Sequence, residues 1–149
     1  VLKHALFKAE KYNNCIFDII LMLQPTAPNR KYIHIDKVIR KIIKENLDTV
    51  WTINEVDKQF HPDKQLKIDE NNKQISYFTP NGKNIITNQE LGKSYMKNGI
   101  CYGFSRKHVL SKENNLAKKN GFILLKGKII NIDNNKDLEI AKNLLKNKI

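Results

Sequence analysis

Arginine is scarce in this 149-residue chain, although the chain as a whole is basic. The net charge is +12, but only three of the 27 basic residues are arginine, at positions 30, 40 and 106. Proteins that read nucleic acid commonly cluster arginines for forked contacts with phosphates and guanine edges, and such clusters are missing here. The charge is instead scattered along the chain, so we expect no nucleic-acid partner.

Cysteines and long apolar runs are equally sparse. Cys15 and Cys101 stand alone, so the sequence predicts neither a disulfide framework nor a zinc site, and a reducing cytoplasm fits best. The longest apolar stretch, residues 16–23, contains Asp18 and is far shorter than the roughly 20 residues that span a bilayer, so we expect no membrane partner. A glycine-rich phosphate loop and an initiator methionine are also missing, and we expect the chain to begin within a longer protein.

The order of the predicted elements is that of an α/β fold. Apolar residues at helical spacing predict a helix from about Leu2 that is broken at Asn13 and Asn14. The run IFDIILML then predicts a buried strand, a second helical pattern follows from Ile35, and TVWTINEV predicts another strand. A strand that is apolar on both faces is typical of a parallel sheet covered by helices, and the strand–helix–strand order implies a right-handed crossover.

The second half of the chain begins with a polar segment. Residues 57–97 contain prolines, an Asn-Gly turn and only short β-like pieces, QLKID and QISYF, so we interpret them as an inserted arm. After the arm we expect a strand at GICYGFS, a weak helix over 107–119, strands at GFILL and KIINI, and a closing helix capped by Asn134. The apolar face of the closing helix is predicted to consist of Leu138, Ala141, Leu144 and Leu145.

Two strand ends carry the most informative polar groups. The loop LQPTAPNR, residues 23–30, holds Gln24 and Thr26 between prolines after the first strand, where ligands bind in open α/β sheets. Asn131 and Asp133 lie two residues apart after the last predicted strand, so both can face one Mg²⁺. Each segment also has a simpler interpretation: a rigid turn for the first and a helix-capping turn for the second.

Two further residues have the chemistry of a sugar site. Tyr102 offers a hydroxyl and a ring face to a sugar, although a tyrosine in a strand is more often a packing residue. Lys64, in the arm segment HPDK, can pair with a carboxylate, although a surface lysine in a chain with 24 of them usually only contacts solvent. No Ser/His/Asp or Cys/His constellation stands out, so we assign no catalytic side chain.

Taken together and in order, these segments resemble the acylneuraminate cytidylyltransferases, the CMP-sialic acid synthetases. LQPTAPNR resembles the family's LQPTSPLR loop, NGICY its NG-x-x-Y segment, INIDNNKDL its IDID-x-x-x-DL ending, and HPDK its HP-x-K. The resemblance covers the whole chain but only the later two thirds of a family member. The family's A-R-x-x-S-K-R type loop, which holds CTP, has no counterpart here.

The resemblance implies a doubly wound, mostly parallel, Rossmann-like sheet of the nucleotide-sugar-transferase kind, incomplete at its N-terminus. Residues 1–149 would be the C-terminal portion of one domain, with a β-rich dimerisation arm at about 57–97. The implied reaction activates an acidic nine-carbon sugar, a nonulosonic acid, with CTP to give a CMP-sugar and pyrophosphate, with Mg²⁺ as cofactor. The implied protein is a cytoplasmic homodimer.

Carried over by residue, the resemblance assigns Gln24, Lys64 and Tyr102 to the sugar and Asp133 to Mg²⁺. Asn131 stands where the family has the first Asp of IDID, which removes one negative charge from the metal site. Thr87 and Asn88 stand where the family usually has arginine before Gln-x-Leu. These departures and the missing loop leave a second interpretation open, an inactive remnant that serves as a sugar-binding or assembly module.

Overall fold

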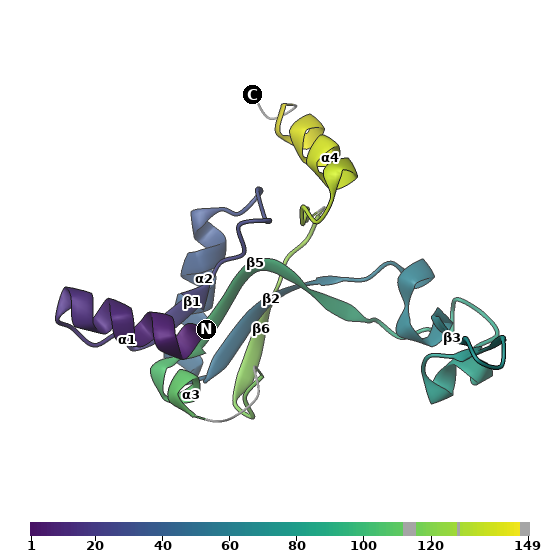
Figure 1. Ribbon diagram of the computed structural model, residues 1–149, viewed down its shortest axis with the longest axis horizontal. Helices are drawn as coiled ribbons and strands as arrows, with labels where there is room; N and C mark the ends of the chain where they lie inside the picture. The colour runs from purple at the N-terminus through teal and green to yellow at the C-terminus, as the bar shows by residue number, and fades with distance from the viewer. Residues whose placement is uncertain (112–115, 128, 147–149) are drawn as a thin grey trace. The chain divides into compact units, whose positions relative to one another are not determined.

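The computed structural model describes residues 1–111, 116–127 and 129–146, without the side chains of residues 144–146. The chain divides into two compact units, Val1–Ile53 with Lys97–Ile149 and Asn54–Met96. No helix in the described ranges is long and apolar enough to span a membrane. The elements of the first unit, two of which extend into the second, are α1 (Leu2–Asn13), β1 (Ile19–Met22), α2 (Tyr32–Glu45), β2 (Thr49–Glu55), β5 (Tyr95–Ser105), α3 (Arg106–Leu110), β6 (Asn120–Leu124) and α4 (Asn135–Lys146) (Figure 1).

The helices α1 and α2 both end at an asparagine in the left-handed conformation. Asn14 and Asn46 each have φ of 49°, a conformation that asparagine tolerates better than most residues. The backbone N–H of Asn46 turns back to the carbonyl of Ile42, which satisfies one of the helix's last acceptors. The helix end predicted at Asn13 and Asn14 is confirmed.

The four strands of the first unit form one sheet in the order β1-β5-β2-β6 (Figure 1). β1 pairs with β5 antiparallel, and β2 pairs with β6 parallel. Backbone hydrogen bonds from Ser105 to Asp48 and from Val56 to Ser94 join opposite ends of β2 and β5, so these strands are antiparallel. β1, β2 and β6 therefore run in one direction and only β5 is opposed among the described strands. The predicted mostly parallel α/β sheet is confirmed.

The hydrophobic core fixes α2 on this sheet. Val38 and Ile42 of α2 are buried in one cluster with Val50 of β2 and Ile100 of β5. Gly103 allows the close approach, because a Cβ at this position would lie 2.6 Å from the side chains of both Val38 and Ile42. Since α2 follows the loop of residues 23–31, this packing also fixes where the loop ends.

Two sequence predictions in the C-terminal part are wrong. Residues 129–132 of the predicted KIINI strand are not in a strand, and Lys128 lies outside the described residues. Gly127, with φ of 89°, turns the chain after β6, and the N–H of Ile132 then bonds the carbonyl of Thr26. The helix predicted over 107–119 is shorter, because α3 ends at Leu110, residues 116–119 are not helical, and residues 112–115 are outside the description.

The closing helix α4 has the predicted cap. The side chain of Asn134 accepts the backbone N–H groups of Lys136 and Asp137. Ala141 is buried and Leu138 is partly exposed, whereas the side chains of Leu144 and Leu145 lie outside the described residues.

The second unit consists of short elements joined by turns. It contains the single turns of 3₁₀-helix η1 (Lys58–Phe60), η2 (Pro62–Lys64) and η3 (Pro80–Asn84), and the hairpin of β3 (Leu66–Asp69) with β4 (Gln74–Tyr77). The two short strands predicted from QLKID and QISYF are thus confirmed. Apolar side chains face each other across the hairpin, with Leu66 opposite Tyr77 and Ile68 opposite Ile75, and all four are exposed.

Candidate functional site

The loop after β1 is held as a series of tight turns. The N–H of Ala27 bonds the carbonyl of Gln24, and the N–H of Arg30 bonds the carbonyl of Ala27. The buried side chain of Ala27 anchors the middle of the loop in the core. Gln24 is half-buried, and its backbone N–H bonds the carbonyl of Gly99 on β5 at 3.3 Å. The loop therefore presents Gln24 and Thr26 in a fixed backbone geometry at the carboxyl end of β1.

The segment containing Asn131 and Asp133 meets this loop. The N–H of Ile132 donates to the carbonyl of Thr26 at 2.8 Å, and the hydroxyl of Thr26 donates to Oδ1 of Asn131 at 2.6 Å. Nδ2 of Asn131 in turn donates to Oδ2 of Asp133 at 2.9 Å. The two segments therefore meet, although the second is an extended loop and not the end of a strand.

The Asn98–Gly99 segment, which lies within strand β5, forms the third side of the site. Gly99 has φ of 74°, and an ideal Cβ there would lie 2.2 Å from Oε1 of Gln24 and 3.3 Å from Oδ1 of Asn131. The side chains of Gln24 and Asn131 thus both approach the same glycine. Glycine suits this position for two reasons. The positive φ is strained for residues with a Cβ, and the missing Cβ leaves room for the side chain of Gln24.

Tyr102, three residues after Gly99 on β5, is nearly fully buried. Its hydroxyl accepts the backbone N–H of Gly99 at 2.7 Å, and its ring packs against Trp51 with centroids 5.5 Å apart. Burial raises the pKa of Tyr102, so the phenol stays protonated at neutral pH. The structure thus shows Tyr102 supporting Gly99, and its predicted contact with a sugar stays a prediction.

A buried hydrogen-bond network links the Asn98–Gly99 segment to β2. The hydroxyl of Thr52 donates to Oδ1 of Asn98 at 2.7 Å and accepts the N–H of Cys101 at 2.9 Å. Nδ2 of Asn98 is buried without a hydrogen-bond partner in the described ranges, and such a donor is commonly satisfied by a ligand or an ordered water. Burial also raises the pKa of the Cys101 thiol to about 11, so this cysteine is protonated at neutral pH and a poor nucleophile.

Asp133 and Asn131 offer Mg²⁺ at most one carboxylate and one amide oxygen. The described part of the chain contains no group of three His, Cys, Asp or Glu side chains placed to hold a metal ion. Mg²⁺ usually keeps several waters and takes one or two carboxylates together with substrate phosphates. The exposed carboxylate of Asp133 matches that limited need. Asn131 donates its Nδ2 to Asp133 and its Oδ1 accepts the Thr26 hydroxyl, so its amide would have to turn to offer an oxygen to the same ion.

Lys64 belongs to the second unit, where it lines a groove of about 590 Å³. It is the only basic residue among the described residues that line this groove. Thr87 and Asn88, where the resemblance leads us to expect arginine, line the same groove. The described lining of this groove therefore combines one cation, Lys64, and one carboxylate, Asp63, with neutral side chains. Sequence patterns indicated Lys64 but not its neighbours in space.

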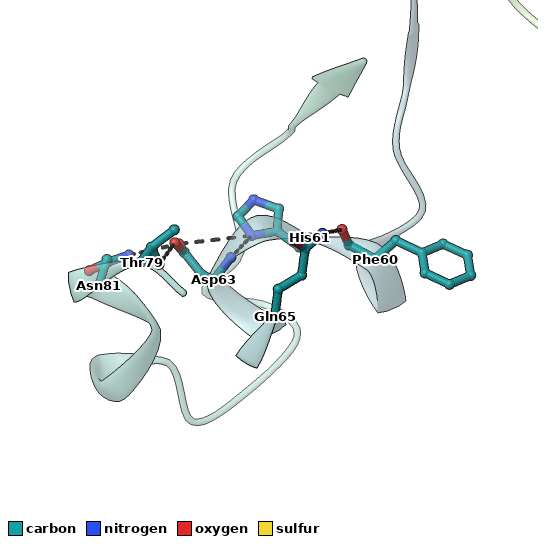
Figure 2. Close-up of polar contacts among 6 residues, drawn as sticks. All are labelled: Phe60, His61, Asp63, Gln65, Thr79 and Asn81. Atoms are coloured by element: carbon teal, nitrogen blue, oxygen red, sulfur yellow. Dashed lines mark hydrogen bonds and ion pairs between the residues drawn. The ribbon is translucent and has the colours of Figure 1, made fainter. Parts of the chain in front are cut away.

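A hydrogen-bond cluster fixes the turn that carries Lys64. Oδ1 of Asp63 accepts the hydroxyl of Thr79 at 2.5 Å, and Oδ2 accepts Nδ2 of Asn81 at 2.9 Å (Figure 2). On the other side Nδ1 of His61 accepts the N–H of Asp63 (Figure 2). The hydrogen bonds from Thr79 and Asn81 hold the pKa of Asp63 below its usual range. Asp63 thus links η2 to η3 next to Lys64.

This lowered pKa predicts a pH-dependent stability of the second unit. The contribution of Asp63 is fully present above its unfolded pKa of about 3.9 and is lost as the pH falls through the lower folded value. We expect Asp63→Asn to lower the urea midpoint at pH 7 and to have a smaller effect at pH 3. Glu70→Gln removes the same charge from an exposed turn and serves as the control. Equal losses for Asp63→Asn at both pH values would contradict the prediction.

Three residues at the site were not predicted. Gly99, Thr52 and Arg30 receive no role from the sequence patterns, since the partners of Thr52 and Arg30 are backbone groups or lie on another strand. A glycine directly after asparagine within a strand pattern was a usable indication of an unusual backbone at Gly99. No local pattern identifies the other two.

Comparison with known proteins supports the fold. No protein-family model matches the chain. The chain is 27% identical over 149 residues to post-translational flagellin modification protein B of Campylobacter coli, covering 99% of this chain and 61% of that relative. It thus spans less than two thirds of the length of this curated relative. The solved structure of CMP:2-keto-3-deoxy-manno-octonic acid synthetase complexed with CTP is similar over 100% of this chain and 69% of that one, with a TM-score of 0.61 and 11% identity. At that identity the similarity shows the fold, a mixed α/β architecture with a mostly parallel sheet.

Proposed function

We propose that this chain is the acidic-sugar-binding part of a cytidylyltransferase that converts CTP and a nonulosonic acid into a CMP-sugar and pyrophosphate. The observation that carries the proposal is the meeting of the Gln24–Thr26 loop with Asn131 and Asp133 at one end of the sheet. Support also comes from the fold shared with a synthetase solved with CTP and from the relative named for flagellin modification.

The chemistry asks mainly for placement of the reactants. The anomeric hydroxyl of the sugar attacks the α-phosphorus of CTP, a new C–O–P bond forms, the bond to the β-phosphate oxygen breaks, and the hydroxyl proton is released. In such displacements in-line orientation and charge neutralisation do most of the work. Asp133 and Asn131 would hold Mg²⁺, which supplies positive charge to the phosphate oxygens when bound.

The sugar would be held by neutral and cationic groups. In the first unit, the amide of Gln24 offers a donor and an acceptor to sugar hydroxyls. In the second unit, considered by itself, the ammonium group of Lys64 suits a carboxylate. Tyr102 would support the pocket wall through Gly99. We assign these three residues to the substrate.

The second unit suits contact with a second copy of the chain. Leu66, Ile68, Ile75 and Tyr77 form exposed cross-strand pairs on the hairpin, and side chains two apart on a strand share a face. An exposed apolar face is typical of an interaction surface. We therefore propose a homodimer in which this unit makes the contact.

One observation favours a second candidate, a sugar-binding module without transfer activity. The amide of Asn131 hydrogen-bonds Asp133, where an Asp pair would share a metal ion. Such a module would bind an acidic sugar but would not consume CTP.

The test is a calorimetric titration of the 149-residue chain with N-acetylneuraminic acid and, separately, with CTP and Mg²⁺. We expect binding of the sugar. If the chain binds neither this sugar nor 2-keto-3-deoxy-manno-octonic acid, both candidate functions are overturned. Formation of a CMP-sugar by the chain would exclude the module.

The assigned side chains make separate predictions for the two ligands. In a full-length version that carries the CTP-holding loop, we expect Gln24→Ala and Lys64→Ala each to weaken sugar binding about tenfold, the loss of about one hydrogen bond, and to leave CTP binding unchanged. Lys67→Ala removes a nearby exposed lysine of the second unit and serves as the control. Equal losses for the sugar and CTP would contradict the assignment.

A further inference from the structure

Arg30 is bonded differently from the other arginines of the chain. Arg40 pairs with Asp36 at 2.7 Å, and Arg106 pairs with Glu10 at 2.8 Å. Within the described ranges no carboxylate lies within ion-pair distance of Arg30, and its half-buried guanidinium instead bonds backbone carbonyls. Lysine is the usual basic residue of this chain, with 24 lysines against three arginines. An arginine at position 30 therefore indicates a role that depends on the guanidinium group.

The carbonyls that Arg30 binds come from two segments that meet at the candidate site. Nε donates to the carbonyl of Ile100 at 2.6 Å. Nη2 donates to the carbonyl of Gln24 and also, at 3.4 Å, to that of Gly99. Hydrogen bonds from a charged donor are roughly twice as strong as neutral ones. Arg30 therefore clamps the backbone of Gln24 onto β5, in addition to the bond from the N–H of Gln24 to Gly99.

The clamp controls the place of the Gln24 side chain as well as its backbone. Oε1 of Gln24 would lie 2.2 Å from a Cβ at Gly99, so the amide rests directly against the glycine backbone. A small shift of the loop away from β5 would remove this contact. The fork geometry matters, because Nε and Nη2 reach different carbonyls at once, whereas a lysine offers one ammonium group.

We propose that Arg30 is a positioning residue that fixes the amide of Gln24 for the acidic sugar. This inference deepens the proposed function and rests on it for the identity of the ligand. Arg30 itself acts through backbone carbonyls.

The experiment compares Arg30→Lys, which keeps the charge but loses the fork, with the matched control Arg40→Lys. We expect Arg30→Lys to bind N-acetylneuraminic acid about tenfold more weakly, equivalent to one charged hydrogen bond, and to bind CTP unchanged. The side-chain amide resonances of Gln24, assigned by their loss in Gln24→Ala, should shift and broaden in Arg30→Lys but not in Arg40→Lys.

Unchanged Gln24 amide resonances and sugar affinity in Arg30→Lys would overturn the proposal. If the wild-type chain binds no acidic sugar, the proposed function fails, whereas the Gln24 resonances still decide whether Arg30 positions this side chain. If Arg30→Lys does not fold, hydrogen exchange of the wild-type chain tests whether Arg30 binds these backbone carbonyls. The Nε–H of Arg30 should exchange at least about tenfold more slowly than that of exposed Arg40, and equal rates would overturn the clamp.

Discussion

Substituting alanine for Gly99 is expected to lower the free energy of unfolding by about 1–2 kcal/mol and to weaken acidic-sugar binding by at least about tenfold. The φ of 74° costs a residue with a Cβ about 1–2 kcal/mol. The new methyl group would also lie 2.2 Å from Oε1 of Gln24, the far end of a flexible side chain, so the amide would be displaced at little further cost in stability. Since Gln24 must move, the proposed sugar contact is lost together with stability.

Two other glycines separate the causes of this effect. Gly127 has φ of 89° but no described atom within 4 Å of an ideal Cβ, so Gly127→Ala should show the backbone strain alone. Gly92 has neither a near neighbour among the described atoms nor a positive φ, so Gly92→Ala should be close to wild type. Urea unfolding and sugar titration of the three variants make the comparison. We expect Gly99→Ala and Gly127→Ala to lose similar stability but only Gly99→Ala to lose sugar affinity. Equal sugar affinities would mean that Gln24 does not rest on Gly99.

The meeting of the two polar segments was predictable from local sequence because each follows from strong local rules. A short apolar run ended by Pro25 predicted β1 and its loop, and an Asn-rich turn before a helical pattern placed Asn134 as a cap. In a mostly parallel sheet, the carboxyl ends of strands lie on one edge. The apolar run KIINI misled the prediction, since Gly127 turns the chain and the following residues bond the Thr26 loop in place of a neighbouring strand.

The supporting contacts of the site were beyond local patterns. Thr52 binds Asn98 across two strands, a contact that depends on the register of β2 and β5. Arg30 binds carbonyls, which every residue carries, so no side-chain motif marks its partners. The assignment of Lys64 to the sugar rested on the resemblance, and it stays a prediction.

Replacing Asn131 by aspartate is expected to tighten Mg²⁺ binding about thirtyfold. A second carboxylate about 4 Å from a divalent ion adds about 2 kcal/mol of attraction even at the dielectric constant of water. Without Mg²⁺ the substitution should destabilise the chain. The hydrogen bond from Nδ2 of Asn131 to Asp133 is then replaced by repulsion between two carboxylates. We expect the unfolding free energy of the metal-free variant to fall at pH 7.

The pH dependence of this loss follows from the pair of carboxylates. Two neighbouring carboxylates raise the pKa of one of them, so the destabilisation disappears as the pH falls through that raised value and the pair shares a proton. Mg²⁺ should therefore stabilise Asn131→Asp more than wild type at pH 7, as measured by thermal unfolding with and without the ion. Asn143→Asp, which adds the same charge at an exposed position of α4, should respond like wild type. An unchanged Mg²⁺ titration in Asn131→Asp would mean that Asn131 and Asp133 form a helix-capping loop without a metal, and the reaction would then need its charge neutralisation from elsewhere.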